Sequence, residues 1–107
     1  MGFDKRNSPR YPLVAEMSYE HMGFSSPGKL TDVSLGGFFL DTINPLPEGS
    51  TIGFKFGLSG DGSEIPIKGE GRVVWQRPFQ GMGIRFTWIS ATDQNRLLTY
   101  LSQKLSV

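Results

Sequence analysis

The hydrophobic pattern has a period of two over most of the chain, which predicts strands with one buried face. The clearest stretch is residues 51–58, where Ile52, Phe54, Phe56 and Leu58 stand at every second position. Apolar positions also alternate with polar ones from Leu13 onward. The expected strands cover residues 13–20, 29–33, 37–41, 51–58, 65–76 and 81–88.

Glycine and proline separate these segments. The chain has 14 Gly and 7 Pro in 107 residues, and such frequent breakers favour short strands joined by turns over long helices. Residues 25–28, 44–50 and 60–62 are the expected turns. Gly69 and Gly71 fall inside the fifth expected strand and indicate a bulge or strong curvature there.

A helical period begins only near the C-terminus. Ser90 and Asp93 resemble an N-cap followed by an acid in the first turn of a helix. Leucine then recurs at helical spacing, at Leu97, Leu98, Leu101 and Leu105. We therefore expect a helix over residues 91–105. Six strands followed by one helix predict an all-β fold, a closed six-stranded antiparallel barrel with the helix over one mouth or face, since closure removes exposed edges.

Aromatic residues are numerous on the expected strands. Such side chains can form a stacking platform for single-stranded nucleic acid. Most of them occupy the apolar face of an alternating strand, so we expect them in the core. The set is Phe38, Phe39, Phe54, Phe56, Phe86 and Trp88, and alternation puts Trp88 on the same face as Met82, Ile84 and Phe86. Trp75 stands near the end of its strand, beside Gln76 and Arg77, and is expected at a rim.

The length fits one domain, and the net charge of +1 does not by itself imply a nucleic-acid or membrane partner. Residues 1–10 carry Lys5, Arg6 and Arg10 against Asp4, whereas the rest of the chain has eight Lys and Arg against nine Asp and Glu. The positive excess is therefore in an N-terminal arm. No apolar run approaches the roughly 18 residues of a membrane span, and the N-terminal residues lack the apolar core of a secretory signal peptide. We expect a cytoplasmic protein.

Most catalytic chemistries are excluded or unsupported. The absence of cysteine removes disulfides, thiolate metal sites and cysteine nucleophiles. The one histidine, His21, excludes sites that need two histidine ligands, and no Gly-x-Ser-x-Gly sequence accompanies it. Glycine-rich segments at 60–62 and 69–71 are not followed by a helix, so they are not phosphate loops. We expect no enzyme, metal or cofactor.

Two short patterns indicate a ligand site. Arg6 and Arg10 are four residues apart with Pro9 between them, which disfavours a helix and predicts an irregular or extended arm with two guanidinium groups. Such groups suit an anion with several oxygen edges. Asp32 and Ser34 are two apart on a strand, so they share a face, and Gly37 follows at a sharp turn.

Together, Arg6-x-x-x-Arg10 and Asp32-x-Ser34-x-x-Gly37 resemble the paired signature of the PilZ domain family, bacterial receptors for cyclic di-GMP. Val73-Val74-Trp75 and the segment from Gly81 to Phe86 resemble the family's scaffold motifs. The resemblance covers nearly the whole chain. It implies a six-stranded antiparallel barrel with a C-terminal helix, in agreement with the pattern of the chain.

The resemblance also implies roles. Arg6 and Arg10 would contact the phosphates and the O6/N7 edges of guanine, with Lys5 as an extra phosphate partner. Asp32 would accept hydrogen bonds from the other guanine edge, and Ser34 would add a hydroxyl contact. Gly37 would leave room for a flat ring. Trp75 would pack beside a base.

The resulting hypothesis is a cyclic di-GMP receptor with a flexible ligand-binding arm at 1–10 and a barrel domain at 11–107. Ligand would order the arm and present a new surface to a separate effector protein, with the receptor a monomer or a ligand-linked dimer. One alternative is a PilZ-like protein-interaction module that no longer depends on nucleotide. Another is a single-strand nucleic-acid barrel, which the net charge of −1 outside the arm disfavours.

Overall fold

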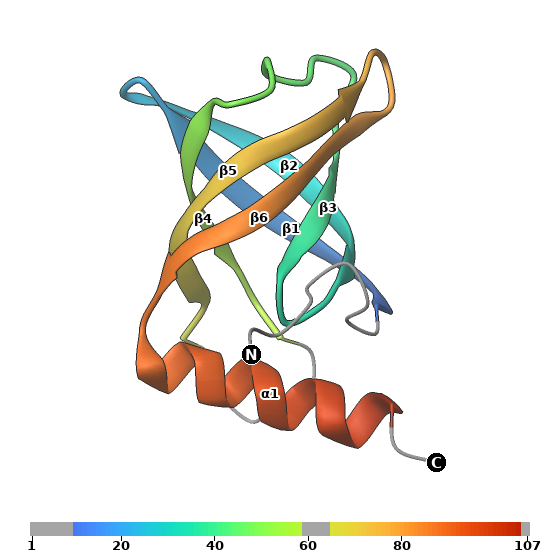
Figure 1. The fold of residues 1–107 in the computed structure, drawn as a ribbon, viewed down its shortest axis with the longest axis vertical. Coiled ribbons are helices and arrows are strands. Elements are labelled where there is room, and N and C mark those ends of the chain that lie inside the picture. The colour runs from blue at the N-terminus through green and yellow to red at the C-terminus, as the bar shows by residue number, and fades with distance from the viewer. Residues whose placement is uncertain (1–9, 59–64, 106–107) are drawn as a thin grey trace, which may run out of the picture.

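The computed structural model describes residues 10–58 and 65–105. Within them the chain forms a closed antiparallel barrel whose strands are ordered β1-β2-β3-β6-β5-β4, with one helix after the last strand (Figure 1). The fold predicted from the sequence is confirmed. The elements are β1 (Tyr11–His21), β2 (Phe24–Val33), β3 (Gly37–Asp41), β4 (Thr51–Phe56), β5 (Ile67–Arg77), β6 (Gly81–Ile89) and α1 (Ala91–Leu105).

The interior of the barrel is filled by the apolar faces of the alternating strands. Phe38 lies at its centre, with ring centroids 5.1 Å from Phe54, 5.7 Å from Phe56 and 5.8 Å from Phe86. Edge-to-face and tilted pairs at such separations are favourable beyond the area that they bury. Residues that the alternation assigned to the core are buried as expected: Leu13, Phe54, Phe56, Ile84 and Phe86.

The first hairpin differs from the prediction. Its turn lies at Met22–Gly23, where both φ angles are positive, 52° and 83°, as the two-residue turns of hairpins require. Residues 25–28, which were expected to form the turn, belong to β2. Pro27 is tolerated there because the ladder between β2 and β3 begins only at Lys29, so no third strand needs a donor from the proline.

Trp88 was expected to face the core, but a bulge between β5 and β6 places it on the outside of the barrel. Glu70 pairs with Trp88 and Gly71 pairs with Phe86, so Thr87 is an extra residue on β6. An extra residue reverses the alternation beyond it. Trp88 is therefore 57% exposed instead of buried beside Phe86. The glycines of β5 did indicate the irregularity, but not its effect on the partner strand.

Gly37 is required by the close approach of β3 to β6. It pairs with Arg85, and a Cβ atom added to it would lie 1.9 Å from the carbonyl oxygen of Ile84. Backbone atoms of a paired strand cannot move away without breaking the ladder. The close approach of β6 is thus one reason for glycine at this position, and the expected room for a flat ring beside Gly37 stays a prediction.

The helix α1 lies across one end of the barrel (Figure 1). It begins as predicted, because the backbone N–H of Asp93 donates to Ser90 Oγ at 3.1 Å. The Asp93 carboxylate in turn accepts a bond from the backbone N–H of Lys68 at 3.3 Å, which joins the helix to β5. Leu97 and Leu101 are buried. The described part of the chain contains no helix with the length and apolar character needed to cross a membrane.

Replacing Ser90 with alanine removes the N-cap acceptor, so Ser90→Ala is expected to lower the free energy of unfolding by about 1 kcal/mol. Thr92→Ala, at an exposed position of the first turn, is the control and should change stability by less than half as much. Urea unfolding followed by circular dichroism measures both. Equal stability of the two variants would show that the cap does not hold α1.

The close contact of Gly37 generates a second prediction. Gly37→Ala should lower the free energy of unfolding by roughly 2 kcal/mol or more, because the added methyl group meets the backbone of β6. Gly53→Ala is the matched control, since the nearest atom to a Cβ there is 3.9 Å away. Denaturant midpoints of both variants test the claim, which fails if the two glycines tolerate alanine equally.

Candidate ligand-binding site

The polar residues of the site stand around the turn between β2 and β3. The backbone N–H of Ser34 donates to the carbonyl of Gly37 at 2.8 Å. The Ser34 hydroxyl accepts a bond from the backbone N–H of Gly36 at 3.1 Å and lies 3.4 Å from the Gly37 carbonyl. Ser34 is only 3% exposed. Its hydroxyl therefore holds the turn together.

Arg10 and Asp32 form an ion pair at the edge of this turn. Arg10 immediately precedes β1, and Asp32 pairs with Pro12 across the β1–β2 ladder. The Nε and Nη2 atoms of Arg10 both donate to Asp32 Oδ1, at 2.9 and 2.6 Å. The second carboxylate oxygen of Asp32 has no partner in the described part of the chain. Because the two side chains are 52% and 33% exposed, both remain accessible to a ligand.

Trp75 is turned to the outside of the barrel by a second bulge. Val73 pairs with Ile84 and Trp75 pairs with Gly83, which leaves Val74 as the extra residue on β5. The indole lies over Gly83, where a Cβ would be 2.3 Å from its Nε1 atom. It is stacked on Phe39, with ring centroids 5.3 Å apart and planes inclined by 28°. At 38% exposure, Trp75 offers part of a flat apolar face to solvent.

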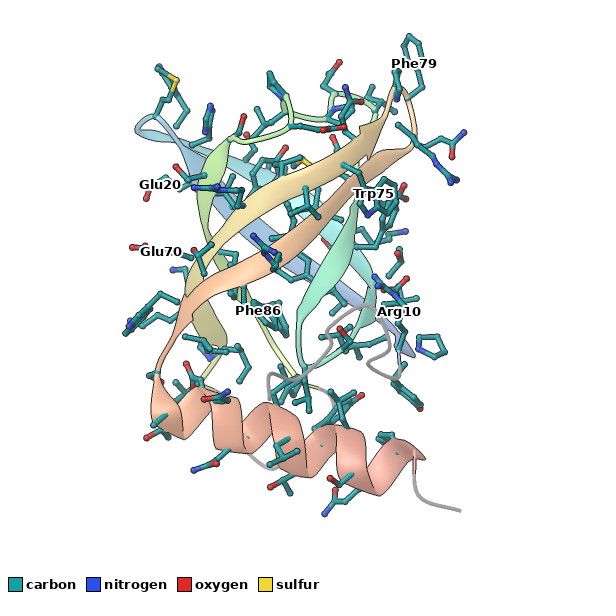
Figure 2. All side chains as sticks on the ribbon, in the orientation of Figure 1. Arg10, Glu20, Glu70, Trp75, Phe79 and Phe86 are labelled. Carbon is teal, nitrogen blue, oxygen red and sulfur yellow. The ribbon has the colours of Figure 1, made fainter. Side chains whose placement is uncertain are left out.

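Most of the residues described above line one pocket, which has a volume of about 290 Å³. It is lined by Arg10, the turn residues Ser34, Gly36 and Gly37, and the tryptophan Trp75. These residues come from three distant parts of the sequence, and the barrel places them together. Figure 2 shows Arg10 and Trp75 on the same side of the molecule. Asp32 does not line the pocket itself, but it accepts two hydrogen bonds from Arg10, which does.

Two predicted site residues, Lys5 and Arg6, lie outside the described residues. Two others were missed by the sequence reasoning. Arg85 lines the pocket. Phe39, which was predicted to lie in the core, instead stacks on the Trp75 ring at the outer surface of the barrel. The alternation of β6 does predict that Arg85 faces outward, because Ile84 and Phe86 on either side are buried. Its nearness to Arg10 follows only from the strand order.

A larger hollow of about 390 Å³ occupies another part of the barrel surface, over β1, β4 and β5. Glu20 and Glu70 line it and lie on the side of the molecule away from Arg10 and Trp75 (Figure 2). Lys55 and Lys68 line it as well, so the charges of the hollow balance. The smaller pocket is the better candidate for an anionic ligand because its charged side chains at the wall are arginines.

The fold is shared with solved structures. The Bacillus subtilis inhibitor of motility MotI/DgrA superposes with a TM-score of 0.81 at 18% identity, over 96% of this chain and 52% of that one. The PilZ domain of Escherichia coli YcgR with c-di-GMP gives 0.70 at 15% identity, over 97% and 100%. The K. pneumonia MrkH–c-di-GMP complex gives 0.71 at 18% identity, over 96% and 53%.

This chain thus spans about half of the length of the MotI/DgrA and MrkH chains. At such low identities the likeness establishes the fold alone. No curated protein gives a significant match to the sequence. A family model of the PilZ domain, however, matches residues 4–103, which is nearly the entire chain. On this match and the barrel architecture, the chain belongs to the PilZ domain family.

Proposed function

We propose that this protein is a cyclic di-GMP receptor that binds the dinucleotide in the pocket between Arg10 and Trp75 and signals to a separate effector protein. The observation that carries the proposal is the assembly of Arg10, the Ser34–Gly37 turn and Trp75 around one hollow. Membership of the PilZ family supports it. So do the MrkH and YcgR structures, which share the fold and contain c-di-GMP.

The chemistry of the ligand fits the groups present. Each guanine has an O6/N7 edge that accepts two hydrogen bonds from a guanidinium, and an opposite edge with N–H donors. Arg10 is assigned to the first edge and to phosphate. Asp32 is assigned to the second edge through the carboxylate oxygen that has no partner among residues 10–58 and 65–105. A base can then stack beside the exposed face of Trp75.

The arm completes the proposed site. Arg6 and Lys5 are assigned to the phosphates, as the sequence signature implies. Ser34 and Gly37 are assigned to the wall of the pocket, because Ser34 secures the turn and Gly37 allows β3 to approach β6. In this proposal the pocket holds the ligand without changing it, since the described side chains that line it include no paired general acid and base. In this proposal the receptor acts in the cytoplasm and needs no cofactor.

A nucleotide-independent interaction module is the alternative function. The accessible Arg10–Asp32 pair favours the receptor, because a module without ligand has no need for charged groups at a hollow beside an exposed indole. Calorimetric titration with cyclic di-GMP, GTP, cyclic di-AMP and a single-stranded oligonucleotide separates the candidates. Selective binding of cyclic di-GMP supports the receptor. Binding of none supports the interaction module, and binding of the oligonucleotide supports a nucleic-acid barrel.

Arg10→Ala should lower the affinity for cyclic di-GMP at least tenfold. A charge-assisted hydrogen bond contributes about 1.5–3 kcal/mol, and tenfold corresponds to about 1.4 kcal/mol. The variant should lose no more than about 1 kcal/mol of stability, because the ion pair with Asp32 is exposed. Titration calorimetry and thermal melts of the same samples measure the two effects.

Arg10→Lys should recover part of the affinity only, since an ammonium group cannot form a two-pronged contact with a guanine edge. Lys55→Ala is the matched control, because it removes an exposed cation from the outer face of β4, away from the pocket. Arg10 would have no role in binding if Arg10→Ala and Lys55→Ala bound the ligand equally well.

The proposed response of the arm can be measured by amide hydrogen exchange. Exchange in residues 1–10 should slow when cyclic di-GMP is added, because contacts of Lys5, Arg6 and Arg10 with the ligand restrict local opening. Exchange in the core strand β4 should remain unchanged. Equal exchange in the arm with and without saturating ligand would contradict signalling through the arm.

A further inference from the structure

Two arginines stand directly opposite one another on the outer surface of the barrel. Arg72 of β5 pairs with Arg85 of β6, and both side chains are exposed. Like charges at directly opposed positions of an antiparallel ladder destabilise the sheet. Neither guanidinium forms an ion pair with any residue in the ranges 10–58 and 65–105. Among these residues, the repulsion between the two guanidinium groups is not offset by an ion pair.

Arg85 also lines the pocket described above, together with Arg10 and Trp75. On its other side in the sheet is Gly37, which has no side chain. The positive charge of Arg72 repels the Arg85 guanidinium from one side, and Gly37 leaves the other side open. Both effects favour an orientation of Arg85 toward the pocket.

The charges of Arg10 and Arg85 are not equivalent. Asp32 compensates Arg10 with two hydrogen bonds to one carboxylate oxygen, whereas Arg85 has no such partner among the described residues. Strands β2 and β3 lie between them in the barrel order. Among the charged residues that line the pocket, the positive charge without an ion-pair partner in the described part of the chain is thus that of Arg85, on the β6 wall. This is where an oxyanion would be held most strongly.

We propose that Arg85 forms a phosphate subsite on the β6 wall of the pocket and that Arg72 is a positioning residue, which directs Arg85 toward the ligand. The inference rests on the proposed function, in which the ligand carries two phosphodiester groups. Arg10 contacts one phosphate, as in the proposed function, and Arg85 contacts the other. A guanidinium suits this role because its planar donors match two oxygens of a phosphodiester.

Such a subsite has effects of opposite sign on folding and on binding. Removing either arginine relieves the repulsion between them, so the free protein should become more stable. The same change should weaken binding of the dinucleotide. A surface residue with only a structural role would not combine these two effects.

The experiment measures cyclic di-GMP affinity by calorimetry at low and high salt, and melting temperature without ligand, for four variants. Arg85→Gln should bind about tenfold more weakly and melt at a higher temperature than the wild type. Its affinity should also depend less on salt, because one charge contact is lost. Arg85→Lys should restore part of the affinity. Arg72→Gln should weaken binding by a smaller factor and also raise the melting temperature.

Lys68→Gln is the matched control, since it removes an exposed cation from the same strand as Arg72 without touching the pocket. It should leave affinity unchanged. If the wild type binds cyclic di-GMP and Arg85→Gln behaves like Lys68→Gln, the subsite is refuted and the receptor function stands. If the wild type does not bind cyclic di-GMP, both proposals are refuted. A lower melting temperature in Arg85→Gln and Arg72→Gln would refute the repulsion that positions Arg85.

Discussion

Closure of the barrel is the constraint on which the other features depend. The last strand in the order, β4, pairs with β1 along residues from Phe56↔Met17 to Gly53↔Glu20. A sheet that closes must twist and bend strongly, and bulges supply the bends. The two bulges of the β5–β6 hairpin turn Trp75 and Trp88 outward. The same curvature that buries Phe38 therefore creates the aromatic wall of the pocket.

The strands and the helix could be predicted because their signals are local. The alternation of β4 and the cap at Ser90 each involve a few neighbouring residues, and the structure confirms both. The burial of Trp88 was predicted wrongly because its position depends on an extra residue in the pairing with β5. The first turn was misplaced for a similar reason, since Pro27 is compatible with a strand only where no third strand pairs with it.

The site was predictable to the extent that its motifs are contiguous. Arg10 and Asp32 were selected from spacing and resemblance, and the structure brings them into contact. Arg85 and Phe39 were not predicted as site residues, because no motif near them in the sequence indicates a site. Their position beside Trp75 arises from the order β3-β6-β5, in which strands distant in the chain become neighbours. Non-local register of this kind has no local signature.

The stacking of Trp75 on Phe39 has a consequence for optical measurements. Its indole is in van der Waals contact with a second aromatic ring and borders the pocket, whereas Trp88 stands on another part of the barrel surface, beside Glu70. The chain has only these two tryptophans. Their fluorescence therefore comes from two separated environments. A molecule bound in the pocket would shield Trp75 from water and change its emission. The emission of Trp88 would stay the same and serve as an internal reference. The protein contains its own fluorescent reporter of pocket occupancy.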